Sequence, residues 1–290
     1  MLDEGPAEVT KGAKSTPNHG SVTQSADGSD VVQATLDYSN DANDPTLVAT
    51  INGVRQKPAD YTHIPGSGVS VTKSRGTYQA SSFYSGEDYD NNPATDTWLV
   101  VEVITDSTGS ADTDYLVAGL WAVISKNSAE PRLLNIGAFV DGNDKFNQSN
   151  LQGLRGSATY IGDAYGAYAT SSSAGFVDGT TTLTAEFGDA SELGTISGRI
   201  DNVKFSETGT ALPNNPILTL NQANIGSSNH GFFSGPTSMT YNSEIFSGKW
   251  GGQFFGNNGN NQPGTVAGTF GGATADGNAA FLGVFAADRQ

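Results

Sequence analysis

Eight short runs of β-type sequence follow one another between about residue 156 and the C-terminus, and they constrain the fold more than any other feature. Each run is rich in Thr, Val, Ile or aromatic residues, and Gly-rich turns separate the runs. We expect strands at 157–168, 176–187, 194–203, 216–225, 231–241, 244–256, 264–272 and 278–289. Antiparallel strands joined in sequence by short connections predict an up-and-down β-barrel, because closure leaves no unpaired edge.

Residue-by-residue alternation within these runs supports the prediction. In 176–187, polar residues face one side (Thr182, Thr184, Glu186) and apolar residues the other (Leu183, Ala185, Phe187). In 194–203 the two faces are Thr195, Ser197 and Arg199 against Ile196, Gly198 and Ile200. A strand with period-two alternation buries one face and exposes the other.

Glycines recur inside the expected strands, where they normally weaken a sheet. They stand at Gly162, Gly166, Gly198, Gly248, Gly251, Gly268 and Gly283. A closed barrel needs sharply curved strands, and glycine fits where side chains would collide. We therefore interpret these glycines as sites of curvature.

The N-terminal half also has β-type sequence. Residues 1–30 are polar and rich in turn formers, which predicts a flexible arm. From 31 to 150, turn clusters separate the runs 31–38, 45–53, 77–84, 97–105, 115–125 and 133–140. Residues 141–153 form a polar joint without a strand pattern. The sequence thus predicts an all-β chain, with one β domain over 31–150 and the barrel over 156–290.

The charge is strongly acidic, with 30 Asp and Glu against 14 Lys and Arg and a net charge of −16. Nucleic-acid binding requires a basic patch, and attachment to anionic lipid requires basic residues, so both are excluded as functions. The acidity favours either simple solubility or steering of a cationic partner.

Cysteine is absent from the sequence, which excludes disulfides and thiol chemistry in this chain. No apolar run is long enough to form a membrane helix, and the first residues lack an apolar signal core. We expect that any signal peptide was removed before Met1, and that a lipid-anchored parent would carry its cysteine just upstream.

The segment from Asp60 to Gly68 is the foremost candidate for ligand binding. It places the phenol of Tyr61 two residues from the imidazole of His63, and on an extended backbone both would share a face. His and Tyr are both ligands of haem iron. The alternative is an ordinary packed or solvated histidine, which is also the interpretation that we favour for His19 and His230.

Aromatic residues cluster in the next expected strand and loop, at Tyr78, Phe83, Tyr84 and Tyr89. If exposed, Tyr84 and Tyr89 would add to a ligand or partner surface near Tyr61; if buried, they belong to the core. The Asp- and Asn-rich turns 40–44, 88–92 and 141–144 could supply oxygen ligands to calcium, but such clusters are also ordinary turn chemistry.

Sequence signatures of enzymes are missing: there is no G-x-S-x-G elbow, H-E-x-x-H, P-loop or dinucleotide fingerprint. We therefore predict a binding protein, not an enzyme, with no required cofactor.

An ordered series of glycine–aromatic segments near the C-terminus carries a family resemblance. FSGKWGGQFFG (246–256) is followed by GTVAGTFG (264–271) and AAFLGVFAA (279–287), and ATYIGDAYG (158–166) and LTAEFG (183–188) lie upstream. The series resembles the barrel domain of the transferrin-binding protein B family over about 135 residues. The family's usual Glu before the second glycine–aromatic strand is absent here, where the stretch is 263–268.

The resemblance implies a handle-like N-terminal β domain and a chain of about one lobe, similar to hemophilin-like and factor H-binding members. It implies a monomeric protein on the Gram-negative cell surface, lipid-anchored or secreted, that an outer-membrane translocon exports. Such a protein would capture haem or an iron-carrying protein and deliver it to a TonB-dependent outer-membrane transporter. The alternative is an adhesin or host-factor-binding protein without nutrient cargo.

Overall fold

The computed structural model describes the backbone of the strands between residues 20 and 142, and most of residues 146–290 in full, except 147, 171–172, 189–192, 227–230 and 258–261. The chain divides into two compact units, and residues 144–290 belong to the second. Each unit is described by itself below. No helix in these described residues has the length and apolarity to cross a membrane.

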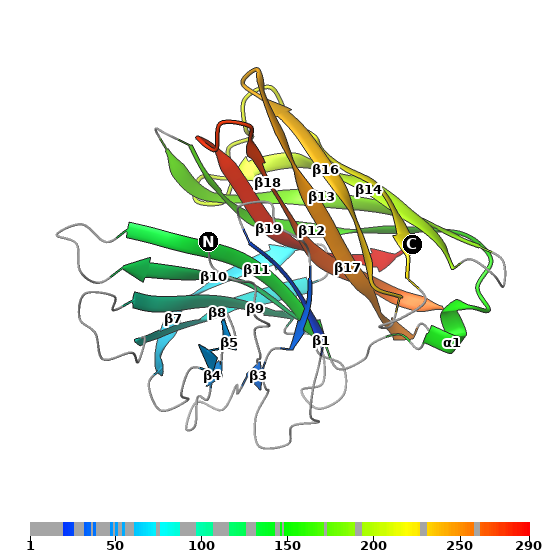
Figure 1. The fold of residues 1–290 in the computed structure, drawn as a ribbon, viewed down its shortest axis with the longest axis horizontal. Helices are drawn as coiled ribbons and strands as arrows, with labels where there is room; N and C mark the ends of the chain where they lie inside the picture. Colours follow the sequence, from blue (N-terminus) through cyan, green and yellow to red (C-terminus); the bar gives the residue numbers. More distant parts are fainter. Residues whose placement is uncertain are drawn as a thin grey trace. The chain divides into compact units, whose positions relative to one another are not determined.

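The first unit contains a seven-stranded sheet and two small two-stranded sheets (Figure 1). In spatial order the large sheet consists of β2 (Val32–Thr35), β1 (Gly20–Ser25), β11 (Arg132–Gly142), β10 (Leu116–Ser125), β9 (Thr97–Asp106), β8 (Gly76–Glu87) and β7 (Tyr61–Lys73). The small sheets pair β3 (Asp37–Tyr38) with β4 (Leu47–Val48), and β5 (Thr50–Ile51) with β6 (Val54–Arg55).

The second unit is a closed barrel of eight antiparallel strands in sequence order, which confirms the predicted barrel (Figure 1). The first and last strands pair from Tyr160–Arg289 to Ala169–Ala280, and this pairing closes the ring. The strands are β12 (Gly156–Ala169), β13 (Ala174–Phe187), β14 (Gly194–Phe205), β15 (Leu218–Ile225), β16 (Phe233–Tyr241), β17 (Glu244–Asn257), β18 (Pro263–Thr274) and β19 (Ala280–Arg289).

Three of these strands, β15, β16 and β19, begin two residues later than the sequence predicts, and the first two differences have a local cause. β15 begins at Leu218, after Asn214 and Asn215, which both take a positive φ that belongs to a turn. β16 begins at Phe233 because Gly231 takes a positive φ of 75°, which belongs to a turn. Both differences follow from local backbone chemistry.

The predicted alternation of faces is confirmed in β13 and β14. Leu183 and Ala185 are fully buried inside the barrel, whereas Thr182, Thr184 and Glu186 point outward. On the neighbouring strand, Ile196 pairs with Ala185 and is fully buried as well.

Glycine pairs face each other on neighbouring strands of the barrel. Gly248 pairs with Gly272, and Gly166 pairs with Gly283. A Cβ added to Gly248 would collide with the carbonyl oxygen of Gly271, and one added to Gly166 would lie 2.6 Å from that of Leu282. Substitution would therefore push strands apart, which agrees with the predicted role of the glycines in curvature.

Aromatic side chains fill the middle of the barrel. Trp250, Phe233 and Phe285 are nearly inaccessible, and the Trp250 ring lies 5.2 Å from that of Phe233. The indole Nε1 donates a 2.8 Å hydrogen bond to the carbonyl oxygen of Asn221, where the β14–β15 pairing is irregular. The large ring is thus buried with its polar atom satisfied.

Candidate functional site

The barrel has two ends that carry different connections. One end carries the connections β12–β13, β14–β15, β16–β17 and β18–β19, and we call it the open end. The opposite end, which we call the closed end, carries the other three connections, the beginning of β12 and the end of β19.

The chain segment before β12 seals the closed end. It contains helix α1 (Gln148–Leu151), which Figure 1 shows beside one end of the barrel. Phe146 donates a 2.9 Å backbone hydrogen bond to the carbonyl oxygen of Phe254, and Phe146 and Leu151 both join the barrel core. Leu151 is only 1% exposed. This segment belongs to the joint that the sequence predicts to be polar and without a strand pattern. The sequence does not predict that Phe146 and Leu151 join the barrel core.

Rings pack closely beneath this seal. The Phe254 ring lies 5.8 Å from Phe233, 6.0 Å from Phe187 and 6.2 Å from Tyr160, in tilted or edge-on arrangements. These are favourable geometries for aromatic pairs. These rings form a continuous aromatic core beneath the seal.

One charged side chain, Arg289, points into this core near Tyr160. Burial raises the pKa of the Tyr160 hydroxyl to about 12, while the charge of Arg289 and its hydrogen bond to the phenol oxygen oppose that rise. The hydroxyl also makes a long contact of 3.4 Å with the carbonyl oxygen of Pro263. Tyr160 is thus neutral throughout the physiological pH range, and its proton is held more tightly than in water.

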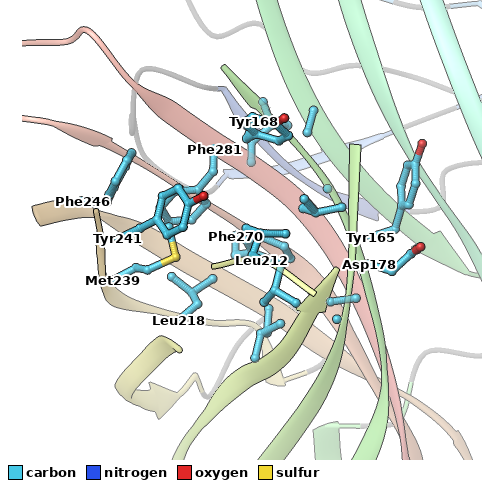
Figure 2. Close-up of a pocket in the computed structure, with 18 of the residues that line it drawn as sticks. Tyr165, Tyr168, Asp178, Leu212, Leu218, Met239, Tyr241, Phe246, Phe270 and Phe281 are labelled. Atoms are coloured by element: carbon cyan, nitrogen blue, oxygen red, sulfur yellow. The ribbon is translucent and has the colours of Figure 1, made fainter. Parts of the chain in front are cut away.

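The open end contains an apolar cavity of about 70 Å³. Figure 2 shows side chains from several strands gathered around it. The inward-facing lining comes from Ala164, Tyr168, Val177, Ile200, Val203, Phe205, Leu212, Leu218, Met239, Tyr241, Phe246, Phe270 and Phe281. Tyr165 and Asp178 also border it but lie apart from the other labelled residues in Figure 2, on the outward face of their strands.

The cavity communicates with solvent through the open end. Tyr168, Met239 and Tyr241 are only partly buried, whereas inward residues deeper in the barrel are fully buried. The connection between β14 and β15 folds back over this opening, since Leu212 donates a 2.9 Å backbone hydrogen bond to Val203 and packs against the core. Leu212 covers the open end less completely than Leu151 covers the closed end.

Carboxylates outnumber cations around the open end. Among the described residues there, Glu207 and Asp276 lie on connections and Glu244 is the first residue of β17, and all three are exposed. Asp178 stands directly opposite Lys204 on neighbouring strands. The pKa of Asp276 is lowered, mainly by a hydrogen bond from the Thr274 hydroxyl and then by bonds from Asn278, so this carboxylate remains charged at neutral pH.

This arrangement can hold a small apolar group beside a negative rim. The cavity is much smaller than the roughly 300–1,000 Å³ of pockets for drug-sized ligands, so it does not accommodate haem. A cavity of about 150 Å³ is known to hold benzene, so a narrower group such as an alkyl chain fits this space better than a ring does.

The residues that the sequence singles out lie in the first unit. Tyr61 and His63 are on β7 and Tyr84 is on β8, the strand beside it in the sheet. The positions of these side chains lie outside the described part of the structure, as do Tyr89, His19 and His230 entirely. The proposed ligand role of Tyr61, His63, Tyr84 and Tyr89 stays a prediction.

The candidate calcium turns also fall largely outside the described residues; only Asp141 and Gly142 belong to a strand, β11. Within the described residues, no group of three or more acidic or histidine side chains is arranged to hold a metal ion.

The cavity and its cover were not predicted from the sequence. Residues such as Phe246, Phe270 and Phe281 are expected in the core, and they are there. Nothing in the alternation of faces marks which of them border empty space. The one available indication was an isolated leucine in the connection between β14 and β15, Leu212, surrounded by Thr, Pro and Asn.

Comparison with known proteins finds no matching family model and no matching curated protein. Among solved structures, a double mutant of transferrin-binding protein B from Haemophilus parasuis Hp5 is 14% identical, with a TM-score of 0.48 over 96% of this chain and 46% of its own. The isotype 1 transferrin-binding protein B from serogroup B Neisseria meningitidis is 16% identical, with a TM-score of 0.45 over 96% of this chain and 44% of its own.

This chain therefore spans a little under half the length of the transferrin-binding proteins that it matches. With TM-scores below 0.5 and identities of 14% and 16%, these superpositions support no conclusion about family or ligand.

Proposed function

We propose that this chain is a binding protein and not an enzyme, with the barrel as its rigid scaffold. The observation that supports this most is the interior of the barrel, where side chains from all eight strands form one continuous apolar core. A scaffold of this kind holds its loops and outer surface in fixed positions, and recognition then takes place on those parts.

The proposed cargo is haem or an iron-carrying protein such as transferrin, handed to a TonB-dependent transporter. The proposal rests on the sequence resemblance of the glycine–aromatic series to the transferrin-binding protein B family. The three C-terminal segments of that series form the neighbouring strands β17, β18 and β19. Display on the Gram-negative surface or secretion, export by an outer-membrane translocon, and a monomeric state are parts of the same proposal.

Haem, if it is the cargo, binds outside the barrel. The 70 Å³ cavity is too small for it, and its lining contains no imidazole. The candidate iron ligands are therefore Tyr61 and His63 on β7, with Tyr84 and Tyr89 as neighbouring contacts.

A titration of the full chain with hemin tests the cargo and the site together. We expect a saturable one-to-one change in the Soret band that His63→Ala abolishes and Tyr61→Phe weakens. His230→Ala is the matched control and should leave the titration unchanged. A Soret change that survives in His63→Ala would keep haem as cargo and reject the β7 site.

Binding of transferrin to the immobilised chain tests the protein cargo. Saturable binding of iron-loaded transferrin supports capture of an iron carrier. If neither hemin nor transferrin binds, the iron-capture proposal is wrong, and affinity for a different host macromolecule would favour the adhesin or host-factor alternative.

A further inference from the structure

We propose that the open end of the barrel binds the alkyl chain of an amphiphile that has a cationic head group. The site is distinct from β7, and the inference does not depend on the iron cargo proposed above. It rests on the cavity, its opening and the charges around it.

The lining of the cavity selects an apolar group. Its deeper wall consists of aliphatic and aromatic carbon from residues such as Ile200, Leu218 and Phe270. A polar or charged group would lose its hydration there without gaining hydrogen bonds. An alkyl chain loses no hydrogen bonds, and each buried methylene adds to affinity.

The opening leaves a path for a chain whose head group stays in water. Leu212 and Met239, which border the opening, are partly buried and unbranched at Cβ, and methionine adapts readily to different neighbours. Two exposed isoleucines, Ile217 (51% exposed) and Ile245 (67% exposed), extend the apolar surface on the outside of the open end. These exposed side chains could contact the part of the alkyl chain that lies outside the cavity.

The charge of the rim selects the head group. Glu207 and Asp276 stand on two connections of the open end and Glu244 at the beginning of β17, and Lys204 near the end of β14 pairs with Asp178. The chain as a whole carries a net charge of −16. A carboxylate or sulfate head would be repelled at this rim, whereas an ammonium head is attracted, within the range set by salt screening.

The test is a titration of the full chain with n-alkyltrimethylammonium bromides from butyl to octyl, each below its micelle concentration. Methyl NMR shifts at Ile200 and Leu218 report occupancy of the cavity. We expect affinity to rise about fourfold for each added methylene and to level off once the cavity is full. No shift at these methyls with any chain length would overturn the proposal.

Variants that change the volume of the cavity should move the chain length at which affinity levels off. Ala164→Leu fills the cavity and should weaken octyl binding at least about tenfold. Ala169→Leu is its matched control on the exposed end of the same strand and should bind as the wild type does.

Leu218→Ala should enlarge the cavity, so that affinity continues to rise with longer chains. Leu193→Ala at the closed end, which removes the same atoms far from the cavity, should not have this effect. Ala164→Leu should lose affinity for octyl chains, whereas Leu218→Ala should gain affinity for longer chains. Unfolding of the variants would lower affinity in both cases and so cannot produce this pair of results.

A comparison of head groups tests the second half of the proposal. With equal chains, octyltrimethylammonium should bind about tenfold more tightly than octanoate at low salt, and the preference should shrink as ionic strength rises. The double variant Glu207→Gln, Glu244→Gln, which keeps Asp276, should narrow this preference. Equal or tighter binding of octanoate to the wild type would show that the rim does not select cations and would overturn that part of the proposal.

Discussion

The two ends of the barrel use the same kinds of inward residues and yet differ in how completely they are filled. At the closed end, Phe146 and Leu151 come from outside the strands and complete an aromatic core. At the open end, Leu212 is the corresponding cover, and it leaves a cavity of about 70 Å³ beneath it. The difference shows that closure of a small barrel depends on its connecting segments as well as on its strands.

This contrast also separates stability from binding within one domain. Close packing at the closed end stabilises the fold, because each buried methylene contributes. At the open end the side chains are packed less closely, and several partly exposed side chains surround a cavity. We therefore expect substitutions at the closed end to affect unfolding, and substitutions at the open end to affect ligands.

The largest expected difference comes from a matched pair of leucine truncations. Leu151→Ala should lower the free energy of unfolding by about 3 kcal/mol, because the side chain is 1% exposed and its loss opens the core. Leu212→Ala should cost only about 1 kcal/mol, because that side chain is only partly buried and borders existing space. Urea denaturation measures both; equal losses would contradict the difference between the two ends.

The next effect concerns the pH dependence of the closed end. The pKa of Tyr160 is raised to about 12, so the folded protein holds this proton more tightly than the unfolded chain, in which tyrosine titrates near 10. The contribution of Tyr160 to the free energy of unfolding is therefore fully present below pH 10. It is lost as the pH rises from 10 toward 12, by up to about 1.4 kcal/mol per pH unit.

Denaturation of the wild type and Tyr160→Phe between pH 9 and pH 11.5 measures this contribution. The wild type should lose stability more steeply than the variant above pH 10. Parallel curves would mean that the hydroxyl of Tyr160 reaches water, and that the closed end is not dry.

A smaller effect is expected in the middle of the barrel at Thr181. Its side chain is fully buried, and its hydroxyl has no hydrogen-bond partner in the structure. Thr181→Val replaces the hydroxyl by a methyl group of similar shape and should stabilise the fold by about 1 kcal/mol. Thermal unfolding checks this; a loss of stability would indicate that water from the open end reaches this depth.

The smallest effect is expected at the rim of the open end. The hydrogen bond from Thr274 is the main cause of the lowered pKa of Asp276. Thr274→Val should therefore move that pKa up toward its ordinary value, as followed by carboxyl ¹³C NMR, although it also removes the bonds between this hydroxyl and the backbone of Ala279. An unchanged titration would mean that the bonds from Asn278 are enough to keep the pKa of Asp276 low.

Much of the barrel could be predicted from the sequence because its rules are local. Alternation assigns Leu183 and Thr182 to opposite faces, and the paired glycines at 248 and 272 explain how the strands curve. Turn conformations at Asn214, Asn215 and Gly231 then adjust strand ends by two residues.

The cavity could not be predicted because it depends on relationships between distant residues. Phe254 and Phe281 look alike in sequence, and only the register of the strands places one in the filled end and the other beside the cavity. The roles of Leu151 and Leu212 depend on how two connecting segments fold back, and neither segment has a strand or helix pattern long enough to recognise.

Xenon binding followed by methyl NMR tests the central difference between the ends most directly, because xenon enters dry apolar cavities without a head group or a specific shape. Under xenon pressure, the account predicts saturable shifts at the methyl groups of Val177, Ile200 and Leu218 around the cavity, and none at Leu151, Leu193 or Ile225 at the closed end. Equal shifts at both ends, or shifts at the closed end alone, would contradict it.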